Sequence, residues 1–363
     1  MIDPVEFKKT LNKNDFNFFT GVPDSVLKHF TNTLDNEESI IAVNEGSALG
    51  ISIGYNLATN KIPVVYLQNS GLGNLVNPYL SISAKNIYDF PVLFIIGWRG
   101  KPGQIDAPQH FHQGKVTPDI LKLMDIKVFE INSNNYSGII KNAKSIIESG
   151  QNVAILVEIN QFKDYKSINE NSCEMQSIDA INIIKQNFIN HYFISSTGLI
   201  SRELYSVTES NGYDHSYNFL NPGGMGHTLP IASTLSKFSN KPVVCIDGDG
   251  SLLMHLGNLH SMINIIKPQG FKYFLLNNNS HDSVGGQSTQ SFEIDFKSLV
   301  CSIGEIKYVK IDSIKKLKSF KPEEKDNYFI ELVIGKRLGE KTHRPKEKYV
   351  DLKQQFIKNI SAE

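Results

Sequence analysis

The chain has few of the features that mark secreted, membrane-bound or nucleic-acid-binding proteins. Its 363 residues include three cysteines, Cys173, Cys245 and Cys301, which are far apart and form no CxxC pair. Such cysteines are typical of reduced thiols rather than of a disulfide framework or a metal site. The 37 basic and 37 acidic residues cancel, so the charge balance gives no reason to expect nucleic acid as a partner.

Long apolar segments are lacking as well. No apolar run approaches the length of a membrane span, and the first residues, MIDPVEFKKT, have no apolar core of a secretion signal. We therefore expect a cytoplasmic protein with neither a membrane nor a nucleic acid partner. A chain of this length is long enough for two domains, each with its own hydrophobic core.

Short apolar strands alternate with helical patterns along the whole chain, which predicts an α/β fold with parallel sheets covered on both faces. We divide the chain into a first domain at 1–160, a polar linker at 161–176 and a second domain at 177–363. Both are predicted to be doubly wound parallel sheets. The predicted strands are 16–20, 40–43, 63–68, 90–97, 128–131, 153–159, 192–195, 217–220, 243–246, 271–276, 308–311 and 328–334. The predicted helices are near 26–33, 47–59, 136–148, 178–188, 292–303 and 314–320, with one more after Asn74 and one that contains Arg202 and Leu204. A long polar loop is predicted at 98–115 and a basic surface segment at 336–348.

The stretch at 241–287 is the most informative part of the sequence. The strand 243–246 runs into Asp247-Gly248-Asp249-Gly250, and Ser251 is a suitable N-cap for a helix extending to Ile266. The next strand, 271–276, runs into three asparagines. Asp249 and Asn278 therefore lie at the carboxyl ends of two strands joined by one helix, where ligands bind in open α/β sheets.

These residues predict a site for a phosphate and a divalent cation. Glycines 248 and 250 allow close approach of the backbone to a phosphate, and the following helix directs N–H groups at it. Asp249, the Asn278 amide oxygen and a nearby backbone carbonyl are hard ligands that suit Mg²⁺ or Ca²⁺. An ordinary βαβ unit with a polar turn remains an alternative. A Rossmann oxidoreductase is weakened because neither half opens with GxGxxG followed by an acidic residue at the expected distance.

Several motifs together resemble the phosphonopyruvate decarboxylase family of thiamine diphosphate-dependent 2-oxo acid decarboxylases, to which sulfopyruvate decarboxylase is similar. They are GVPDSVL (21–27), NEGSALGISIGYNLAT (44–59), QNSGLGNLVNP (68–78), DAPQHFHQG (106–114), SSTGLISREL (195–204), FLNPGGMGHTLPIA (219–232), and GDGS (248–251) through NNNSHDSVGGQ (277–287). The resemblance implies a pyrimidine-binding domain followed directly by a diphosphate-binding domain, with thiamine diphosphate and Mg²⁺ as cofactors.

The resemblance also implies roles for particular residues. Glu45 would activate the aminopyrimidine ring, although a glutamate that only complements the helix dipole is the alternative. The Gly223 carbonyl and Met225 would hold that ring, although Met225 could be ordinary core. The diphosphate and cation would be bound by Thr197, Gly198, Gly248, Asp249, Gly250, Ser251 and Asn278, with the Ser280 carbonyl as the third metal ligand. Asn279 stands where the family commonly has glycine, in a turn with possible positive φ.

The residues around the substrate are less sharply defined by the resemblance. Asp24 matches an acidic position that helps proton transfer after CO₂ leaves, and His110 matches a residue of an active-site loop, although a lone loop histidine is more often a solvated bystander. The remaining substrate-contacting candidates are Ser25, Gln109, His281, Asp282 and Ser283. A dianionic substrate also needs cations, for which the sequence offers Arg99, Lys101, Lys115 and Arg202 without ranking them.

The expected activity is therefore decarboxylation of 3-phosphonopyruvate to phosphonoacetaldehyde and CO₂ in phosphonate biosynthesis. The resemblance implies a homo-oligomer, at least a dimer, whose active sites lie between subunits. Sulfopyruvate or another 2-oxo acid remains an alternative substrate. A scaffold that binds thiamine diphosphate without catalysis is a more distant alternative, against which Glu45, Asp249 and Asn278 argue.

Overall fold

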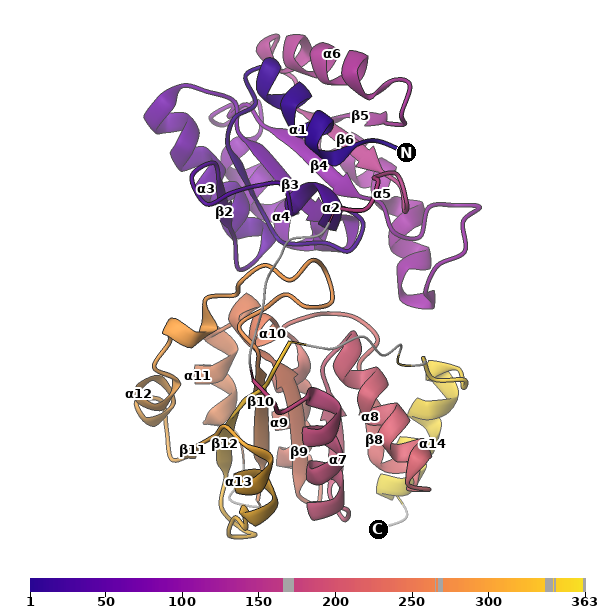
Figure 1. Ribbon diagram of the computed structural model, residues 1–363, viewed down its shortest axis with the longest axis vertical. Helices are drawn as coiled ribbons and strands as arrows, with labels where there is room; N and C mark the ends of the chain where they lie inside the picture. Colours follow the sequence, from indigo (N-terminus) through magenta and orange to yellow (C-terminus); the bar gives the residue numbers. More distant parts are fainter. Residues whose placement is uncertain (166–172, 265, 267–269, 337–341, 343, 362–363) are drawn as a thin grey trace. The chain divides into compact units, whose positions relative to one another are not determined.

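The computed structural model describes residues 1–165, 173–264, 266, 270–336, 342 and 344–361. The chain divides into two compact units. Unit 1 consists of Met1–Asn169 together with Ser283–Gln287, and unit 2 consists of Glu170–Asp282 together with Ser288–Glu363. Each unit is built on its own six-stranded sheet (Figure 1).

The sheet of unit 1 is entirely parallel and has the strand order β2-β1-β3-β4-β6-β5. Its central strands β3, β4 and β6 are buried almost throughout, as their continuous apolar sequences require. The strands are β1 (Phe19–Gly21), β2 (Ser39–Ile41), β3 (Val64–Gln68), β4 (Leu93–Gly97), β5 (Lys127–Glu130) and β6 (Val153–Val157).

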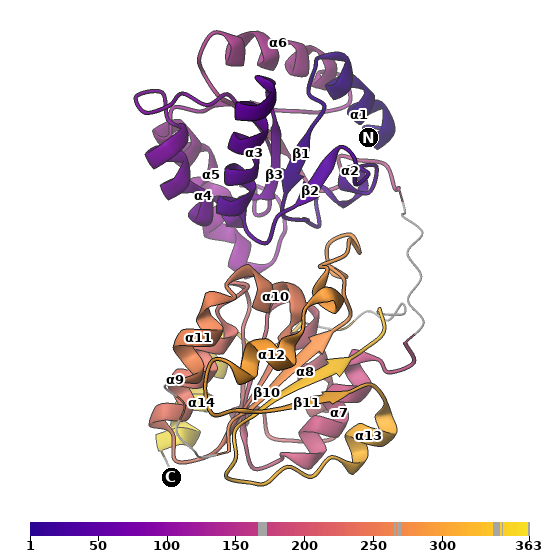
Figure 2. The same ribbon diagram turned by 90° about the vertical axis from the view of Figure 1, so that its left-hand side faces the viewer.

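Helices cover both faces of this sheet (Figure 2). One core lies between the sheet and α1, α2 and α6, and the other lies between the sheet and α3, α4 and α5. The helices are α1 (Pro4–Lys13), α2 (Lys28–Thr31), α3 (Glu45–Thr59), α4 (Leu72–Pro78), α5 (Phe111–Leu123) and α6 (Tyr136–Glu148). Short turns of other helical types occupy Asn69–Gly71, Tyr79–Ser83 and Pro108–His110.

The sheet of unit 2 is also parallel, with the order β11-β12-β10-β9-β7-β8. Its strands are β7 (Tyr192–Ser195), β8 (Asn218–Leu220), β9 (Val243–Gly248), β10 (Lys272–Asn277), β11 (Lys307–Ile311) and β12 (Tyr328–Val333). The helices α7, α8 and α13 pack on one core, and α9, α10, α11 and α12 pack on the other (Figure 2). The helices are α7 (Ser177–Asn187), α8 (Leu199–Ser210), α9 (Thr228–Phe238), α10 (Asp249–Met254), α11 (Gly257–Ile263), α12 (Phe296–Cys301), α13 (Ile314–Ser319) and α14 (Tyr349–Ser361).

The two units have the same topology. When the strands of each unit are counted from its own first strand, both sheets have the order 2-1-3-4-6-5. The order reverses between the first and third strands, β1 and β3 in unit 1 and β7 and β9 in unit 2. Such a reversal is the switch point at which open α/β sheets bind ligands. The predicted pair of doubly wound parallel sheets is confirmed.

Two predictions of local structure are wrong. The predicted loop at 98–115 ends earlier, because α5 already begins at Phe111. The Trp98 indole donates a hydrogen bond to the Gly114 carbonyl (2.8 Å) and thereby joins this helix to the end of β4. The helix predicted from Ser251 to Ile266 begins at Asp249 and is interrupted at His255, whose φ of −135° and ψ of 52° are not helical.

Four helices, α1, α5, α9 and α14, form where no helix was predicted. Most of the predicted basic segment at 336–348, and the middle of the predicted linker at 161–176, lie outside the described residues. Phe162 and Met175, near the two ends of that linker, are buried in the cores of unit 1 and unit 2 respectively. In the part of the chain that the structure describes, the helices are too short or too polar to cross a membrane.

Candidate active site

Glu45 is the first residue of α3 and is almost completely buried, with 5% of its surface exposed. The helix starts here because the Asn44 side chain caps it by accepting a hydrogen bond from the Ser47 N–H (2.9 Å). The Glu45 carboxylate accepts from the Asn74 amide (2.7 Å). Burial raises the pKa of Glu45, and the hydrogen bond from Asn74 partly opposes this. The carboxyl group is therefore suited to share a proton with a ring nitrogen.

A glycine makes room for this carboxyl group. A Cβ atom on Gly71 would lie 2.0 Å from Oε1 of Glu45, closer than any real contact. Gly71 belongs to the turn that follows β3, and Asn74 lies one turn further along in α4. The motif at 68–78 thus supplies both the space around Glu45 and its hydrogen-bond donor.

Asp24 follows β1 and is 1% exposed. Its Oδ2 accepts from the Leu27 N–H (3.2 Å), and its Oδ1 is a buried oxygen for which the described residues provide no hydrogen bond. Burial raises the pKa of Asp24 to about 6, against the lowering effect of nearby backbone N–H groups and of Arg99. A Cβ atom on Gly97 would lie 1.9 Å from Asp24 Oδ2, so this carboxyl group also depends on a glycine for its space.

The four candidate cations differ in their surroundings. Arg99 binds Asp106 through two nitrogens (2.7 and 2.5 Å) and donates from a third to the Ser25 hydroxyl (2.8 Å). Lys101 is paired with two glutamates, Glu130 and Glu158 (2.6 and 2.5 Å). Lys115 is exposed on α5, and Arg202 lies in the first turn of α8 in unit 2. Arg99 is therefore the candidate cation that the structure places beside Ser25 and Asp24.

Asn69 fixes the backbone of Arg99. Its side chain accepts from the Arg99 N–H (3.1 Å) and donates to the Arg99 carbonyl (2.9 Å) and to the Thr117 hydroxyl (2.9 Å). Sequence reasoning missed the roles of Asn69 and Asn74. The signal was present in the motif at 68–78, where both asparagines follow a buried strand within a few residues.

Gln109 and His110 lie in the short turn Pro108–His110 that leads into α5. The Gln109 side-chain oxygen is buried without a hydrogen bond from the described residues. A pocket of about 390 Å³ opens next to this turn. It is lined by Gly100, Gln104, Ile105, Asp106, Ala107, Pro108, Phe111 and His112. The lining includes neither Glu45 nor Asp24, so a molecule in this pocket would not contact the two buried carboxyl groups.

In unit 2, two turns follow strands β7 and β8. Gly198 has a φ of 79° and ends the turn that contains Thr197, directly before α8. After β8, Gly224 and Gly226 have φ values of 65° and 84°. They flank Met225, whose terminal methyl group lies 3.3 Å from a Cβ position on Gly250. The predicted ring-holding turn and the GDGS turn are therefore in contact within unit 2.

Ser251 joins these segments. It is 4% exposed, and its hydroxyl lies 3.2 Å from the Ser196 hydroxyl and 3.0 Å from the Gly226 N–H, which donates to it. It also stabilises the ionised form of Asp247, whose pKa is raised by burial. The hydroxyl of Ser251 is thus used within the protein, so that a phosphate contact from this residue would come from its backbone.

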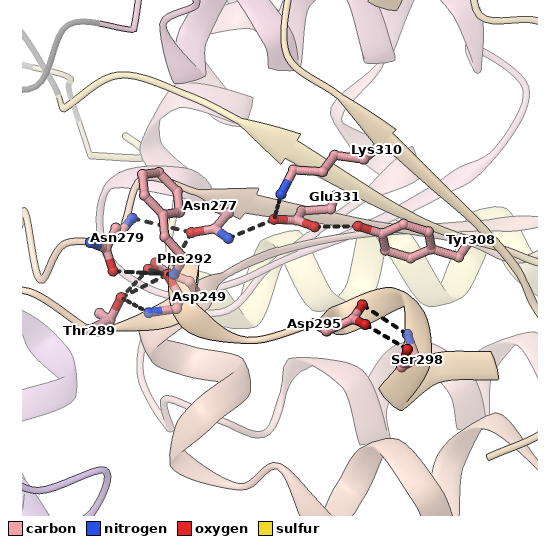
Figure 3. A network of polar contacts seen from close by, with 11 residues as sticks. Asp249, Asn277, Asn279, Thr289, Phe292, Asp295, Ser298, Tyr308, Lys310 and Glu331 are labelled. Carbon is pink, nitrogen blue, oxygen red and sulfur yellow. Dashed lines mark hydrogen bonds and ion pairs between the residues drawn. The ribbon is translucent and has the colours of Figure 1, made fainter. Parts of the chain in front are cut away.

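Asp249 begins α10 and is 3% exposed. Its Oδ2 accepts from the hydroxyls of Thr289 (2.5 Å) and Ser291 (2.8 Å), as Figure 3 shows. Burial raises the pKa of Asp249, and these two donors oppose the rise. Sequence reasoning did not include Thr289 or Ser291, because only the fold brings them to a strand end some forty residues earlier in the chain.

The turn after β10 presents the other predicted metal ligands. The Asn278 side-chain oxygen accepts from the Ser280 N–H (3.0 Å), and Asp282 accepts from the side chains of both Asn278 (3.0 Å) and Ser280 (3.2 Å). Asn279 has a φ of 55°, so the positive φ predicted for this turn is present, in a conformation that asparagine tolerates. Asp282, a substrate-contacting candidate, thus supports the predicted metal ligands in this structure.

The last two substrate-contacting candidates, His281 and Ser283, are grouped with different units. A ring atom of His281 lies 3.1 Å from a Cβ position on Gly250, and burial lowers the pKa of His281 to about 4. Burial thus disfavours a positive charge on this histidine. Ser283 is exposed and belongs to the segment Ser283–Gln287 that is grouped with unit 1.

Comparisons with known proteins agree with this arrangement. Residues 7–123 match the model of the thiamine pyrophosphate enzyme N-terminal TPP binding domain, and residues 196–314 match that of the C-terminal TPP binding domain. A phosphonopyruvate decarboxylase from Streptomyces viridochromogenes is 28% identical over 78% of this chain and 75% of its own. The chain belongs to the thiamine pyrophosphate enzymes, and its predicted resemblance to phosphonopyruvate decarboxylases is confirmed.

Sulfopyruvate decarboxylases are similar to this chain as well. The protein from Methanosarcina acetivorans is 26% identical over 77% of this chain and 76% of its own. The beta subunit from Methanococcus maripaludis is 30% identical over 37% of this chain and 70% of its own. As a member of the family the chain is a thiamine pyrophosphate-dependent decarboxylase, and the predicted family is confirmed.

The residues present fit thiamine diphosphate, the cofactor of the family. The buried Glu45 carboxyl with its raised pKa suits a ring nitrogen, and the glycines at 198 and 224 leave the backbone of unit 2 open to close approach. A carboxylate, an amide oxygen and a backbone carbonyl at 249, 278 and 280 would suit a hard divalent cation. Within the described residues, no group of three His, Cys, Asp or Glu side chains is placed to hold a metal ion.

Proposed function

We propose that this protein converts 3-phosphonopyruvate to phosphonoacetaldehyde and CO₂, with thiamine diphosphate and Mg²⁺, as a step of phosphonate biosynthesis in the cytoplasm. The observation that carries the proposal is the pair of buried carboxyl groups, Glu45 and Asp24, in a chain similar to phosphonopyruvate decarboxylases over 78% of its length. The phosphonate is preferred because the matched phosphonopyruvate decarboxylases are 28% and 27% identical to this chain, against 26% for a sulfopyruvate decarboxylase matched to a similar extent.

Glu45 would act on the cofactor. When bound, thiamine diphosphate supplies the carbanion that adds to a 2-oxo group and the ring that takes up the electrons released with CO₂. Glu45 would share a proton with the pyrimidine nitrogen next to its carboxyl group. The low polarity around Glu45 keeps that proton available, since it disfavours a free carboxylate.

Asp24 would carry the proton that the reaction consumes. Replacement of a carboxylate by an aldehyde hydrogen takes up one proton for each CO₂ released. With a pKa of about 6, Asp24 is partly protonated near neutral pH, which suits a general acid. His110, which also lies near the end of the loop after β4, is the second candidate for this proton.

Arg99 and Ser25 would bind the anionic end of the substrate. Arg99 already donates to the Ser25 hydroxyl (2.8 Å), and a phosphonate oxygen could accept from both groups. In unit 2 the diphosphate would bind at the turns of Thr197 and Gly248–Gly250. Mg²⁺ would be held by Asp249, Asn278 and the Ser280 carbonyl. Because these residues are divided between two units, we propose a homo-oligomer with each site between two subunits.

The substrate is tested with purified protein, thiamine diphosphate and MgCl₂ in parallel assays on 3-phosphonopyruvate, sulfopyruvate and pyruvate. We expect CO₂ release with the highest kcat/KM for 3-phosphonopyruvate. A higher kcat/KM for sulfopyruvate would replace the proposed substrate. In Glu45→Gln we expect loss of turnover with thiamine diphosphate still bound, as measured by calorimetry.

A further inference from the structure

Glu331 is a buried carboxylate that the proposed mechanism does not use. It lies on β12 and is 1% exposed. Its carboxylate accepts from the Asn277 amide (2.9 Å) and the Tyr308 hydroxyl, and it forms an ion pair with Lys310 (3.1 Å), as Figure 3 shows. A buried carboxylate is costly unless it is paired, and well-packed apolar side chains often stabilise a core as well or better. Glu331 is therefore poorly explained by stability alone.

The contacts of Glu331 lead to Asp249 through two side chains. Asn277 gives its N–H₂ to Glu331, so its oxygen faces the other way, where the Ser291 hydroxyl lies at 2.6 Å. Ser291 Oγ is also 2.8 Å from Asp249 Oδ2 and 3.0 Å from the Thr289 hydroxyl, which bonds the same carboxylate oxygen. Since the Ser291 hydroxyl has one proton, it donates to either the Asn277 oxygen or Asp249 and contacts the other. These close contacts extend from β11 to the first residue of α10 (Figure 3).

Glu331 determines the orientation of the Asn277 side-chain amide. An amide side chain has a donor end and an acceptor end, and a carboxylate can only accept. The Glu331 carboxylate, which pairs with Lys310, therefore fixes the donor end of Asn277 toward itself and the acceptor end toward Ser291 and the Asn279 N–H (3.2 Å). This orientation also holds the turn that carries Asn278 and Ser280.

We infer that Glu331 is a positioning residue for the divalent cation. Through Asn277, Ser291 and Thr289 it holds Oδ2 of Asp249 and the turn after β10, so that the other Asp249 oxygen, Oδ1, is presented to the cation together with Asn278. The inference rests on the proposed cation site. It adds to that site a supporting residue, Glu331, that lies outside the motif from GDGS to NNNSHDSVGGQ. Residues that orient metal ligands typically change metal affinity about 10–100-fold when they are replaced.

The test measures cation binding rather than turnover. Apoprotein with saturating thiamine diphosphate is titrated with Mn²⁺ and followed by electron paramagnetic resonance, for wild type, Glu331→Gln, Ser291→Ala and the double variant. We expect each single variant to raise the Kd for Mn²⁺ about tenfold. We expect the double variant to be little worse than either single variant, since both interrupt one network. The exposed Glu305 provides the matched control, and Glu305→Gln should bind Mn²⁺ like wild type.

The outcomes separate this inference from the proposed function. Unchanged Mn²⁺ affinity in Glu331→Gln, or effects of the two substitutions that multiply in full, would overturn the role of Glu331 while the cation site stands. A wild type that binds no Mn²⁺ would overturn both. If Glu331→Gln does not fold, Tyr308→Phe removes one donor from the same carboxylate. An increase of about threefold in Kd is then expected, and no increase overturns the inference.

Discussion

Two buried carboxyl groups in unit 1 share one structural requirement. Each lies where a neighbouring residue must lack a side chain, Gly71 beside Glu45 and Gly97 beside Asp24. At Gly71 the backbone is in the right-handed helical region, so the conformation itself would accept alanine. Only the space taken by the Glu45 carboxyl group forbids it, which allows the position of that group to be tested without altering its chemistry.

Gly71→Ala should therefore lower kcat by about 100-fold, because the new methyl group displaces the Glu45 carboxyl group from its position for reaction. Gly73→Ala is the matched control, since a Cβ there meets nothing within 4 Å. Alanine in this helical position should leave kcat unchanged and raise stability by about 0.5–1 kcal/mol. Steady-state kinetics and thermal unfolding of both variants give the comparison. Equal kcat in the two variants would contradict the proposed role of Glu45.

The burial of Asp24 leads to a second prediction, which concerns how the free energy of unfolding depends on pH. Its pKa is raised from 3.8 to about 6 by burial, so the folded state holds the proton more tightly than the unfolded state. Stability should fall as the pH rises from about 4 to about 6, and the loss should then amount to roughly 3 kcal/mol. Asn cannot ionise and avoids this loss.

Relative to wild type, Asp24→Asn should thus gain about 3 kcal/mol in the free energy of unfolding between pH 4 and pH 7. Urea unfolding at several pH values measures the difference. A difference that does not change with pH would show that Asp24 does not titrate as its burial indicates. The same variant should lose turnover although it is more stable than wild type at neutral pH. This would distinguish the effect of Asp24 on protein stability from its proposed role in catalysis.

Among the elements, the turns after β7, β8 and β9 depend on one another through Ser251. Its hydroxyl contacts Ser196 and Gly226 (3.2 and 3.0 Å) in addition to Asp247. Ser251→Ala should leave these buried groups short of a partner and lower stability by about 1–3 kcal/mol. Binding of thiamine diphosphate, measured by calorimetry, should also be weaker, because the hydroxyl that connects the three turns is missing. Ser302→Ala, at an exposed serine, is the control for which neither value should change.

Strands were predicted from sequence more accurately than the contacts between turns. A buried parallel strand is a continuous apolar run, and β7 was predicted at its observed residues. The break at His255 and the start of α5 at Phe111 depend on tertiary packing, which no local pattern encodes. The same holds for Glu331, Ser291 and Asn74, whose partners lie far away in sequence. Glu45, Asp249 and Asn278 could be proposed from the sequence because short motifs carry them.

On the scale of the whole molecule, the two units use the same strand ends for different tasks. Asp24 and Thr197 follow the first strand of their units, Glu45 and Gly223 the second, and Arg99 and Asn278 the fourth. In the proposed mechanism, unit 1 carries acid–base groups at the edge where unit 2 carries groups for phosphate and a cation. Neither unit holds a complete set, which is the reason to propose that sites form between subunits.

Mixing two inactive variants tests this arrangement. Glu45→Gln impairs unit 1 and Asp249→Ala impairs unit 2, so that each purified variant should be inactive alone. In a dimer with shared sites, a mixed pair contains one doubly impaired site and one intact site. After equimolar unfolding and refolding together, about one quarter of the wild-type activity should return, because half of the dimers are mixed and each has one intact site. If every site instead belonged to a single chain, the mixture would remain inactive.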